Sequence, residues 1–387
     1  RSITLTSLRR LGVIRAALAR CLDRGMPKKS GSLEPLLVTA AAQILFMEAP
    51  DHAAVDLAVH AVRADPRAAP YAALANAVLR TIARERETWA EPQDPFIDTP
   101  AWLAARWRKA WGEETAAAIA LMHRKEPTLD LTVRGAPEEW AEKLGGVVLP
   151  TGSVRLRTHQ PVHELPGYAD GAWWVQDAAA ALPARLLAPR PGERIADLCA
   201  APGGKAAQLA AAGAEVVALD RSAERLKRLS ENFERLRLPV EIAVGDALTY
   251  DAAPFDALLL DAPCTATGTI RRHPDVAWVK RPSDVASLTA VQAKMLDRAA
   301  HLLKPGGRLV YCTCSLEAEE GPQQIAALLR RNPDLQRDPV RAEEIGGLTD
   351  CVTEIGEVRT LPTHLPNEDP RLAGMDGFFI SRLRRRA

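Results

Sequence analysis

Two cysteines, Cys264 and Cys314, are the residues of this chain with the clearest chemical potential, and each follows a short apolar segment. Cys264 ends the run Asp261-Ala262-Pro263-Cys264, and Cys314 is the centre of Thr313-Cys314-Ser315. A thiolate can add to C6 of a cytosine ring, which turns the unreactive C5 atom into an enamine carbon able to attack a methyl group. The two thiols therefore suggest covalent chemistry on a nucleic-acid base.

A glycine-rich turn precedes both cysteines and has the character of a cofactor loop. Its residues are Cys199, Ala200, Ala201, Pro202, Gly203, Gly204 and Lys205. The segment lacks GxGxxG, and Ala206 stands where a phosphate-binding loop needs Ser or Thr for magnesium, which disfavours a nucleotide triphosphatase. Adjacent glycines let the backbone approach a ligand closely, and Pro202 fixes the entry to a helix N-terminus. A small ligand with a carboxylate suits this turn.

Three aspartates end successive apolar segments after this loop: Asp220, Asp246 and Asp261. In α/β cofactor folds a carboxylate after the second strand binds the ribose hydroxyls. Asp246, or the backbone beside it, can reach an adenine amino group. Each aspartate alone could be a plain loop residue, but ribose, adenine and an amino-acid tail together indicate S-adenosylmethionine.

The elements that must position these residues form a repeating pattern from Gly192 onward. Strands are predicted at residues 194–198, 215–219, 241–244, 257–260 and 308–312. Helices are predicted at residues 206–212, 223–236 and 287–303. Such alternation is typical of a parallel, doubly wound α/β sheet, in which ligands bind at the carboxyl ends of the strands. The loop, the aspartates and the cysteines all lie at such ends.

The first part of the chain has a different composition. Residues 8–86 are rich in Ala, Leu and Arg with helical spacing, which predicts an all-helical domain. Prolines at 92, 95 and 100 mark a linker, and a boundary is expected near residue 90. After a helix at residues 101–123, a strand, a helix and a second strand at 129–134, 137–144 and 154–157 predict a small α+β module before residue 172.

Composition limits the class of protein and its partners. Lys and Arg number 50 against 49 Asp and Glu, so the net charge is +1 and RNA would have to meet a local basic surface. An apolar run of about 18 residues and a signal-peptide pattern are both missing, which predicts no membrane partner and a cytoplasmic location. The six cysteines show no CxxC or Cys/His pairing, so no metal site is expected.

These motifs resemble the RNA cytosine-5 methyltransferases of the NOL1/NOP2/Sun family, and the bacterial Sun/RsmB branch is the nearest match. The likeness rests on the cofactor loop, both cysteine motifs, Trp173 to Asp177, the run from Asp261 to Asp275, and Gly377-Phe378-Phe379. Two N-terminal stretches, residues 52–55 and 76–80, resemble a NusB-like RNA-binding domain.

The resemblance implies an α/β fold with three domains. Residues 173–387 would form a Rossmann-like class I methyltransferase domain with a mostly parallel seven-stranded sheet. Residues 91–172 would hold a linker helix and the small α+β RNA-binding module. Residues 1–90 would form the NusB-like all-helical domain, truncated at its N-terminus because the usual first helices have no room before Leu8.

The resemblance also implies roles for individual residues. Cys314 would be the nucleophile at C6, Cys264 would assist product release, and Asp261 would stabilise the protonated N3 of the base. The contacts to S-adenosylmethionine would come from Cys199, Ala200, Ala201, Pro202, Gly203, Gly204, Lys205, Asp220, Asp246 and Asp261. Candidate RNA contacts are Arg271, Arg272 and His273, although a solvated basic loop would look the same.

Several alternatives stay open at this point. DNA cytosine methyltransferases attack with a Pro-Cys at the position of Cys264, and Thr313-Cys314-Ser315 favours Cys314 instead. The expected reaction forms 5-methylcytidine in 16S rRNA, with a tRNA cytosine-5 methyltransferase or a non-catalytic RNA-binding ribosome-assembly factor as the alternatives. No obligate protein partner is inferred.

Overall fold

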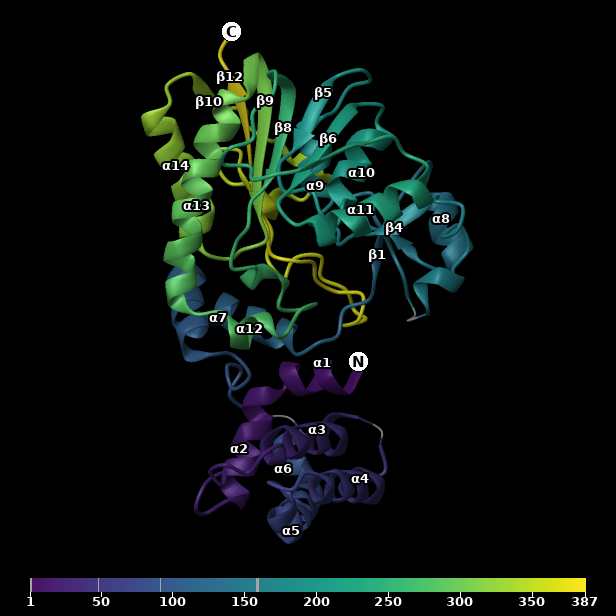
Figure 1. The fold of residues 1–387 in the computed structure, drawn as a ribbon, viewed down its shortest axis with the longest axis vertical. Coiled ribbons are helices and arrows are strands. Elements are labelled where there is room, and N and C mark those ends of the chain that lie inside the picture. Colours follow the sequence, from purple (N-terminus) through teal and green to yellow (C-terminus); the bar gives the residue numbers. More distant parts are fainter. Residues whose placement is uncertain (1, 48, 91, 158–159) are drawn as a thin grey trace. The chain divides into compact units, whose positions relative to one another are not determined.

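The computed structural model describes residues 2–47, 49–90, 92–157 and 160–387, and the chain forms two compact units (Figure 1). The first unit is Arg1–Arg124 with His273–Val279, and the second is Lys125–Arg272 with Lys280–Ala387. The predicted domain boundaries after residues 90 and 172 stay predictions. In the described part of the chain, no helix is both long enough and apolar enough to cross a membrane.

The first unit is helical, as the Ala- and Leu-rich periodicity predicts. Its α-helices are α1 (Ser2–Arg9), α2 (Leu11–Cys21), α3 (Leu33–Phe46), α4 (Asp51–Ala64), α5 (Ala72–Arg84), α6 (Arg86–Ala90), α7 (Ala101–His123) and α12 (Val276–Val279). On α5 the buried residues Ala75, Val78, Leu79 and Ile82 recur at intervals of three and four, so they form one apolar face. This face packs into a core shared with α2, α3 and α4.

The second unit begins with a small antiparallel sheet of order β2-β3-β1-β4. Its elements are β1 (Asp130–Val133), α8 (Pro137–Leu144), β2 (Val147–Val148), β3 (Val154–Arg155) and β4 (Trp173–Val175). Pro137 opens α8, and Gly145 ends it with a φ of +62°. The predicted α+β module is confirmed, and the structure adds the short strands β2 and β4.

The main sheet has the strand order β10-β12-β9-β8-β5-β6-β7, with β11 paired to β12. Its strands are β5 (Arg194–Asp197), β6 (Glu215–Asp220), β7 (Glu241–Val244), β8 (Phe255–Asp261), β9 (Leu303–Thr313), β10 (Leu335–Arg337), β11 (Val358–Arg359) and β12 (Phe379–Arg385). Strands β5 to β9 pair in parallel, whereas β10, β11 and β12 pair antiparallel. The predicted α/β class with a mostly parallel sheet is confirmed, and the described residues form eight strands where seven were expected, because the short β11 adds to β12.

Helices cover both faces of this sheet, as Figure 1 shows. They are α9 (Leu182–Leu187), α10 (Gly204–Ala211) and α11 (Ala223–Leu236) on one face, and α13 (Pro282–His301) and α14 (Pro322–Arg331) on the other. Along β8, Ala257 and Leu259 pack with the first set, and Leu258 and Leu260 with the second. Successive side chains of a strand point to opposite faces, so an unbroken apolar strand fills two cores.

Candidate active site

A cavity of about 330 Å³ opens at the carboxyl ends of β5, β6, β7, β8 and β9. Asp220, Asp246 and Asp261 line it, together with Cys264 and Cys314. The carboxyl ends of parallel strands lie at the same edge of a sheet. Asp220 and Cys314, which are 94 positions apart in the sequence, therefore line the same cavity. Of the predicted loop residues, Cys199 and Ala201 also line this cavity, whereas its lining does not include Ala200, Pro202, Gly203, Gly204 and Lys205.

The glycine-rich loop joins β5 to α10 beside this cavity. Gly203 has a φ of +104°, and a Cβ there would lie 2.9 Å from the side chain of Leu229. Glycine is therefore required on two counts, backbone conformation and space. Burial raises the pKa of the Cys199 thiol far above its ordinary value, so this cysteine of the loop is no nucleophile at neutral pH.

Lys205, the last residue of the loop, is fixed to the carboxylate of Asp261. Its Nζ donates to Asp261 Oδ2 at 2.7 Å. Burial opposes the charged ammonium, but Asp261 outweighs this and raises the pKa of Lys205. On its other oxygen, Asp261 accepts from Cys312 Sγ at 3.5 Å. An ion pair therefore joins the glycine-rich loop to Asp261, the cavity-lining residue at the end of β8.

Two further carboxylates stand at the ends of β6 and β7. Asp220 is 3% exposed, accepts from the backbone N–H groups of Ala201 and Ser222 at 3.3 and 3.0 Å, and pairs with Arg225 at 3.1 Å. Asp246 is exposed and accepts from Leu248 N at 2.9 Å. Asp220 therefore also shapes the loop, while Asp246 is open to a ligand.

Asp197 ends β5 directly before the cavity-lining residues Leu198 and Cys199, and the sequence patterns did not single it out. It is 1% exposed, and its Oδ1 has no hydrogen-bond partner among the described residues. Burial and the nearby Asp261 carboxylate raise the pKa of Asp197 to about 7. A buried acceptor without a partner fits a ligand that brings a donor, and S-adenosylmethionine carries an ammonium group on its amino-acid end. The sequence does contain a signal for this residue, an acidic side chain two positions before the glycine-rich loop.

The two thiols on the cavity wall are in contact. Cys264 Sγ and Cys314 Sγ are 3.5 Å apart. The hydrogen bond to Cys314 and burial both raise the pKa of Cys264 well above its ordinary value. Cys264 therefore keeps its proton at neutral pH and is suited to donate it toward Cys314.

The loop that carries Cys264 also packs against the other cysteine loop and the C-terminal tail through its backbone. Gly268 N donates to the carbonyl oxygen of Cys314 at 3.0 Å, and Gly377 N donates to that of Gly268 at 2.8 Å. A Cβ on Gly268 would lie 1.9 Å from the Gly377 oxygen. The glycines at this crossing leave room for three segments beside the thiols.

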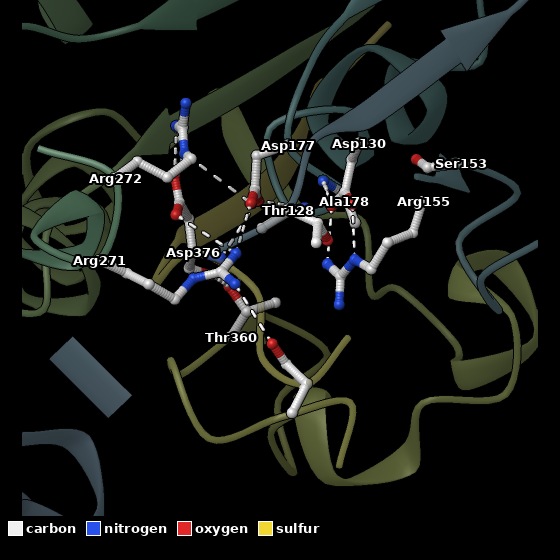
Figure 2. A network of polar contacts seen from close by, with 12 residues as sticks. Thr128, Asp130, Ser153, Arg155, Asp177, Ala178, Arg271, Arg272, Thr360 and Asp376 are labelled. Carbon is white, nitrogen blue, oxygen red and sulfur yellow. Dashed lines mark hydrogen bonds and ion pairs between the residues drawn. The ribbon is translucent and has the colours of Figure 1, made fainter. Parts of the chain in front are cut away.

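A network of ion pairs supports the loop that follows Cys264 (Figure 2). Three carboxylates pair with three guanidinium groups in the order Asp130–Arg155, Asp177–Arg271 and Asp376–Arg272. Arg155 and Arg271 also donate to carbonyl oxygens of the tail at Leu372 and Ala373, at 2.7 and 3.3 Å. Within the second unit, the network thus joins the small sheet, the loop after Cys264 and the tail before β12.

The network changes the interpretation of Arg271. Its side chain is 2% exposed and donates to Asp177 at 2.9 Å, so the structure leaves no open guanidinium for an RNA phosphate. We therefore assign Arg271 to the internal network instead of the RNA surface. Arg272 keeps 32% of its side chain exposed, and His273 belongs to the first unit. RNA contact by Arg272 and His273 stays a prediction.

Comparison with known proteins agrees with this site. Residues 184–384 match a family described as 16S rRNA methyltransferase RsmB/F, and residues 1–84 match the NusB family. Ribosomal RNA small subunit methyltransferase B of Klebsiella pneumoniae is 38% identical over 348 residues, which cover 85% of this chain and 80% of that protein. The protein of the same name from Xanthomonas campestris is 38% identical over 359 residues, covering 88% and 81%.

A solved structure supports the fold. A methyltransferase homologue from Pyrococcus horikoshii is 27% identical with a TM-score of 0.62. The match covers 76% of this chain and 98% of that protein. The family match spans the glycine-rich loop, the strand-end carboxylates and both cysteines. The chain belongs to the RsmB/F family of 16S rRNA methyltransferases, with a NusB-family domain at its N-terminal end.

Proposed function

We propose that this protein methylates C5 of a cytosine in 16S rRNA, with S-adenosylmethionine as methyl donor. The observation that carries the proposal is the pair of thiols in contact, 3.5 Å apart, in one cavity with the strand-end carboxylates. A methyltransferase that acts on an amino group or a hydroxyl needs no thiol. Addition to cytosine C6 needs one, and a second thiol beside it has a use when the adduct breaks down.

The cofactor would be held by residues around the glycine-rich loop. Asp220 would accept from the ribose hydroxyls, Asp246 would lie near the adenine, and Asp197 would accept from the ammonium group. When bound, S-adenosylmethionine supplies an electrophilic methyl group. The loop backbone and Lys205 would fix the amino-acid end, and Asp261 would link this end to the base.

Cys314 would act as the nucleophile. Its thiolate would form a bond from Sγ to C6, and the electrons of the C5–C6 double bond would move to C5, which then accepts the methyl group. Asp261 would stabilise the proton on N3 that this shift of charge requires. The raised pKa of Cys264 supports this assignment, because a protonated Cys264 is a poor nucleophile and a good hydrogen-bond donor to Cys314.

Cys264 would then assist release. The C5 proton must leave, the C5–C6 double bond must form again, and the Sγ–C6 bond must break so that Cys314 departs. Cys264 would take the C5 proton while it gives its own proton to the departing sulfur, so Cys314 would leave as a thiol and lose that proton to water before the next turnover. Its place in contact with Cys314 suits both steps.

The substrate assignment rests on the family and on the chemistry of the site. The target base must leave its stack to reach a cavity at a sheet edge, which is easiest in unassembled RNA. The matches to methyltransferase B support 16S rRNA, and the NusB-family domain supports RNA binding. A cytoplasmic location stays a prediction.

Transfer of a labelled methyl group to purified RNA tests the proposal, followed by bisulfite sequencing of the product. We expect one 5-methylcytidine in 16S rRNA and none in tRNA. Label in tRNA alone would show that the substrate is tRNA and not 16S rRNA. Label at an atom other than cytosine C5 would contradict the cytosine-5 chemistry. Cofactor binding without any transfer would favour an assembly factor.

A further inference from the structure

A buried glutamate, Glu320, lies directly behind the two thiols. It ends the short 3-10 helix Ala318–Glu320 and is 0% exposed. Its Oε1 accepts from Thr265 N at 2.9 Å, and its Oε2 accepts from Ser315 Oγ at 2.5 Å and also from Thr265 Oγ1. Thr265 follows Cys264 and Ser315 follows Cys314. One carboxylate therefore binds the residues next to both cysteines.

Glu320 is itself fixed from two sides. Gln292 on α13 donates through Nε2 to Glu320 Oε1 at 3.1 Å and to the carbonyl oxygen of Pro263 at 2.9 Å. The backbone carbonyl of Glu320 accepts from Tyr311 Oη at 2.8 Å and Thr313 Oγ1 at 3.2 Å, both on β9. The backbone of Glu320 is thus bound to the main sheet, and its carboxylate is linked through Gln292 to the residue before Cys264.

These contacts use two acceptor oxygens, which a carboxyl side chain offers and an amide does not. Four donors converge on its two oxygens: one backbone N–H, two hydroxyls and one amide NH₂ group. A glutamine of the same shape offers a single acceptor oxygen and turns two N–H donors toward groups that are already donors. Charge-assisted hydrogen bonds are also roughly twice as strong as neutral ones.

We propose that Glu320 is a positioning residue that holds Cys264 and Cys314 in contact by binding the residues that follow them. The inference rests on the proposed cysteine mechanism and extends it to a residue outside the cavity wall. Cys264 and Cys314 stand on separate loops after β8 and β9, and a cysteine has a single side-chain torsion before its sulfur. The Sγ–Sγ distance is therefore set by the spacing of the two loops.

The first test is the steady-state kinetics of Glu320→Gln with 16S rRNA. We expect kcat to fall about 10- to 100-fold, because an error of about 1 Å in the placement of reacting groups can cost that much. The KM values for RNA and cofactor should stay within about twofold, because Glu320 is not part of the cavity wall. Glu354→Gln, the same change at an exposed glutamate, is the matched control and should keep the wild-type kcat.

The second test measures the two thiols without methyl transfer. Diamide, an azo oxidant, takes one hydrogen from each thiol, so that a Cys264–Cys314 disulfide forms and the azo group becomes a hydrazine. Peptide mass spectrometry follows this disulfide over time, with Cys264→Ala as the blank. Glu320→Gln should form it about tenfold more slowly than the wild type, since effective concentration falls as the thiols separate.

The two measurements together decide the proposal. If Glu320→Gln does not fold, Thr265→Val takes its place, because it removes one hydroxyl donor and keeps the backbone N–H bond. A disulfide rate and a kcat at wild-type levels in either variant would overturn the positioning role. Failure of the wild type to methylate RNA would count against the proposed function, while the diamide comparison would still report on Glu320.

Discussion

The least expected residue beside the cavity is Asp197, a carboxyl that is buried in the free protein with one oxygen lacking a partner among the described residues. A carboxylate in this position costs folding free energy, because burial and Asp261 both disfavour its charge. A positively charged ligand would remove that cost. The residue is thus better explained by ligand binding than by stability.

Asp197 should make the stability of the protein depend on pH. The pKa of Asp197 is raised from 3.8 to about 7 in the folded protein. Between these values the folded state holds more protons than the unfolded state, so the free energy of unfolding falls as the pH rises. Asp197→Asn cannot lose a proton, so its stability relative to wild type should rise by about 2 kcal/mol between about pH 5 and pH 7.

Denaturant unfolding of both proteins, without cofactor, measures this difference. Cofactor affinity, measured by calorimetry at neutral pH, should fall about tenfold or more in Asp197→Asn, because a hydrogen bond to a charged group is lost. A pH-independent stability difference would show that Asp197 is ionised in the folded protein throughout.

At the scale of elements, three segments meet at Gly268, which belongs to the short 3-10 helix Thr267–Thr269 and lies between Cys314 and the C-terminal tail. Gly268→Ala would put a Cβ 1.9 Å from the carbonyl oxygen of Gly377, and this backbone cannot rotate away as a side chain could. We expect a loss of stability of about 3 kcal/mol or more, the upper end for overpacking, and a matching loss of methyl transfer. Thermal unfolding and transfer of labelled methyl groups measure the two effects. Wild-type values for both would mean that the crossing is looser than the structure indicates.

Sequence periodicity predicted the regular elements of the second unit well. The helix Ala223–Leu236 and the strand Glu241–Val244 have the ends expected from their apolar spacing. Strand β9 begins at Leu303, five residues before the predicted start at residue 308. The prediction was late because Pro305, Gly306 and Gly307 have the composition of a turn. The strand Trp173–Val175 was missed since three residues carry too little periodicity.

The site was predicted less completely than the fold, for a physical reason. The loop, the strand-end aspartates and the cysteines have local motifs, and each lies next to a recognisable strand. The partner of Arg271 lies 94 residues away, so its burial depends on a tertiary contact that local sequence does not encode. Glu320 has two other glutamates within three positions, and only the folded chain distinguishes it from them.

At the scale of the whole molecule, the chain leaves the second unit after Arg272 and returns to it at Lys280. The intervening segment belongs to the helical unit, where Trp278 Nε1 donates to the carbonyl oxygen of Leu8 at 2.8 Å and the ring lies 6.0 Å from the Arg15 guanidinium. The same stretch of chain that carries Cys264 therefore continues into the NusB-family unit. The polypeptide thus joins the loop that carries Cys264 directly to the helical unit, which would be the RNA-binding part of the chain.

Trp278→Ala in the full chain tests this link. We expect the amides of residues 273–279 to exchange hydrogen faster by about tenfold or more, because loss of a half-buried aromatic costs about 1–2 kcal/mol. The value of kcat/KM for 16S rRNA should fall with it, while cofactor affinity stays unchanged. Exchange at the wild-type rate would show that this segment is held by contacts other than Trp278.

The most direct test of the central claim is a denaturing gel of the enzyme after incubation with 16S rRNA and cofactor. Cys264→Ala should give a shifted band, because Cys314 can still attack C6 but release is impaired. Cys314→Ala should give no methyl transfer and no shifted band. A covalent RNA adduct with Cys314→Ala, and none with Cys264→Ala, would contradict the assignment of Cys314 as the nucleophile.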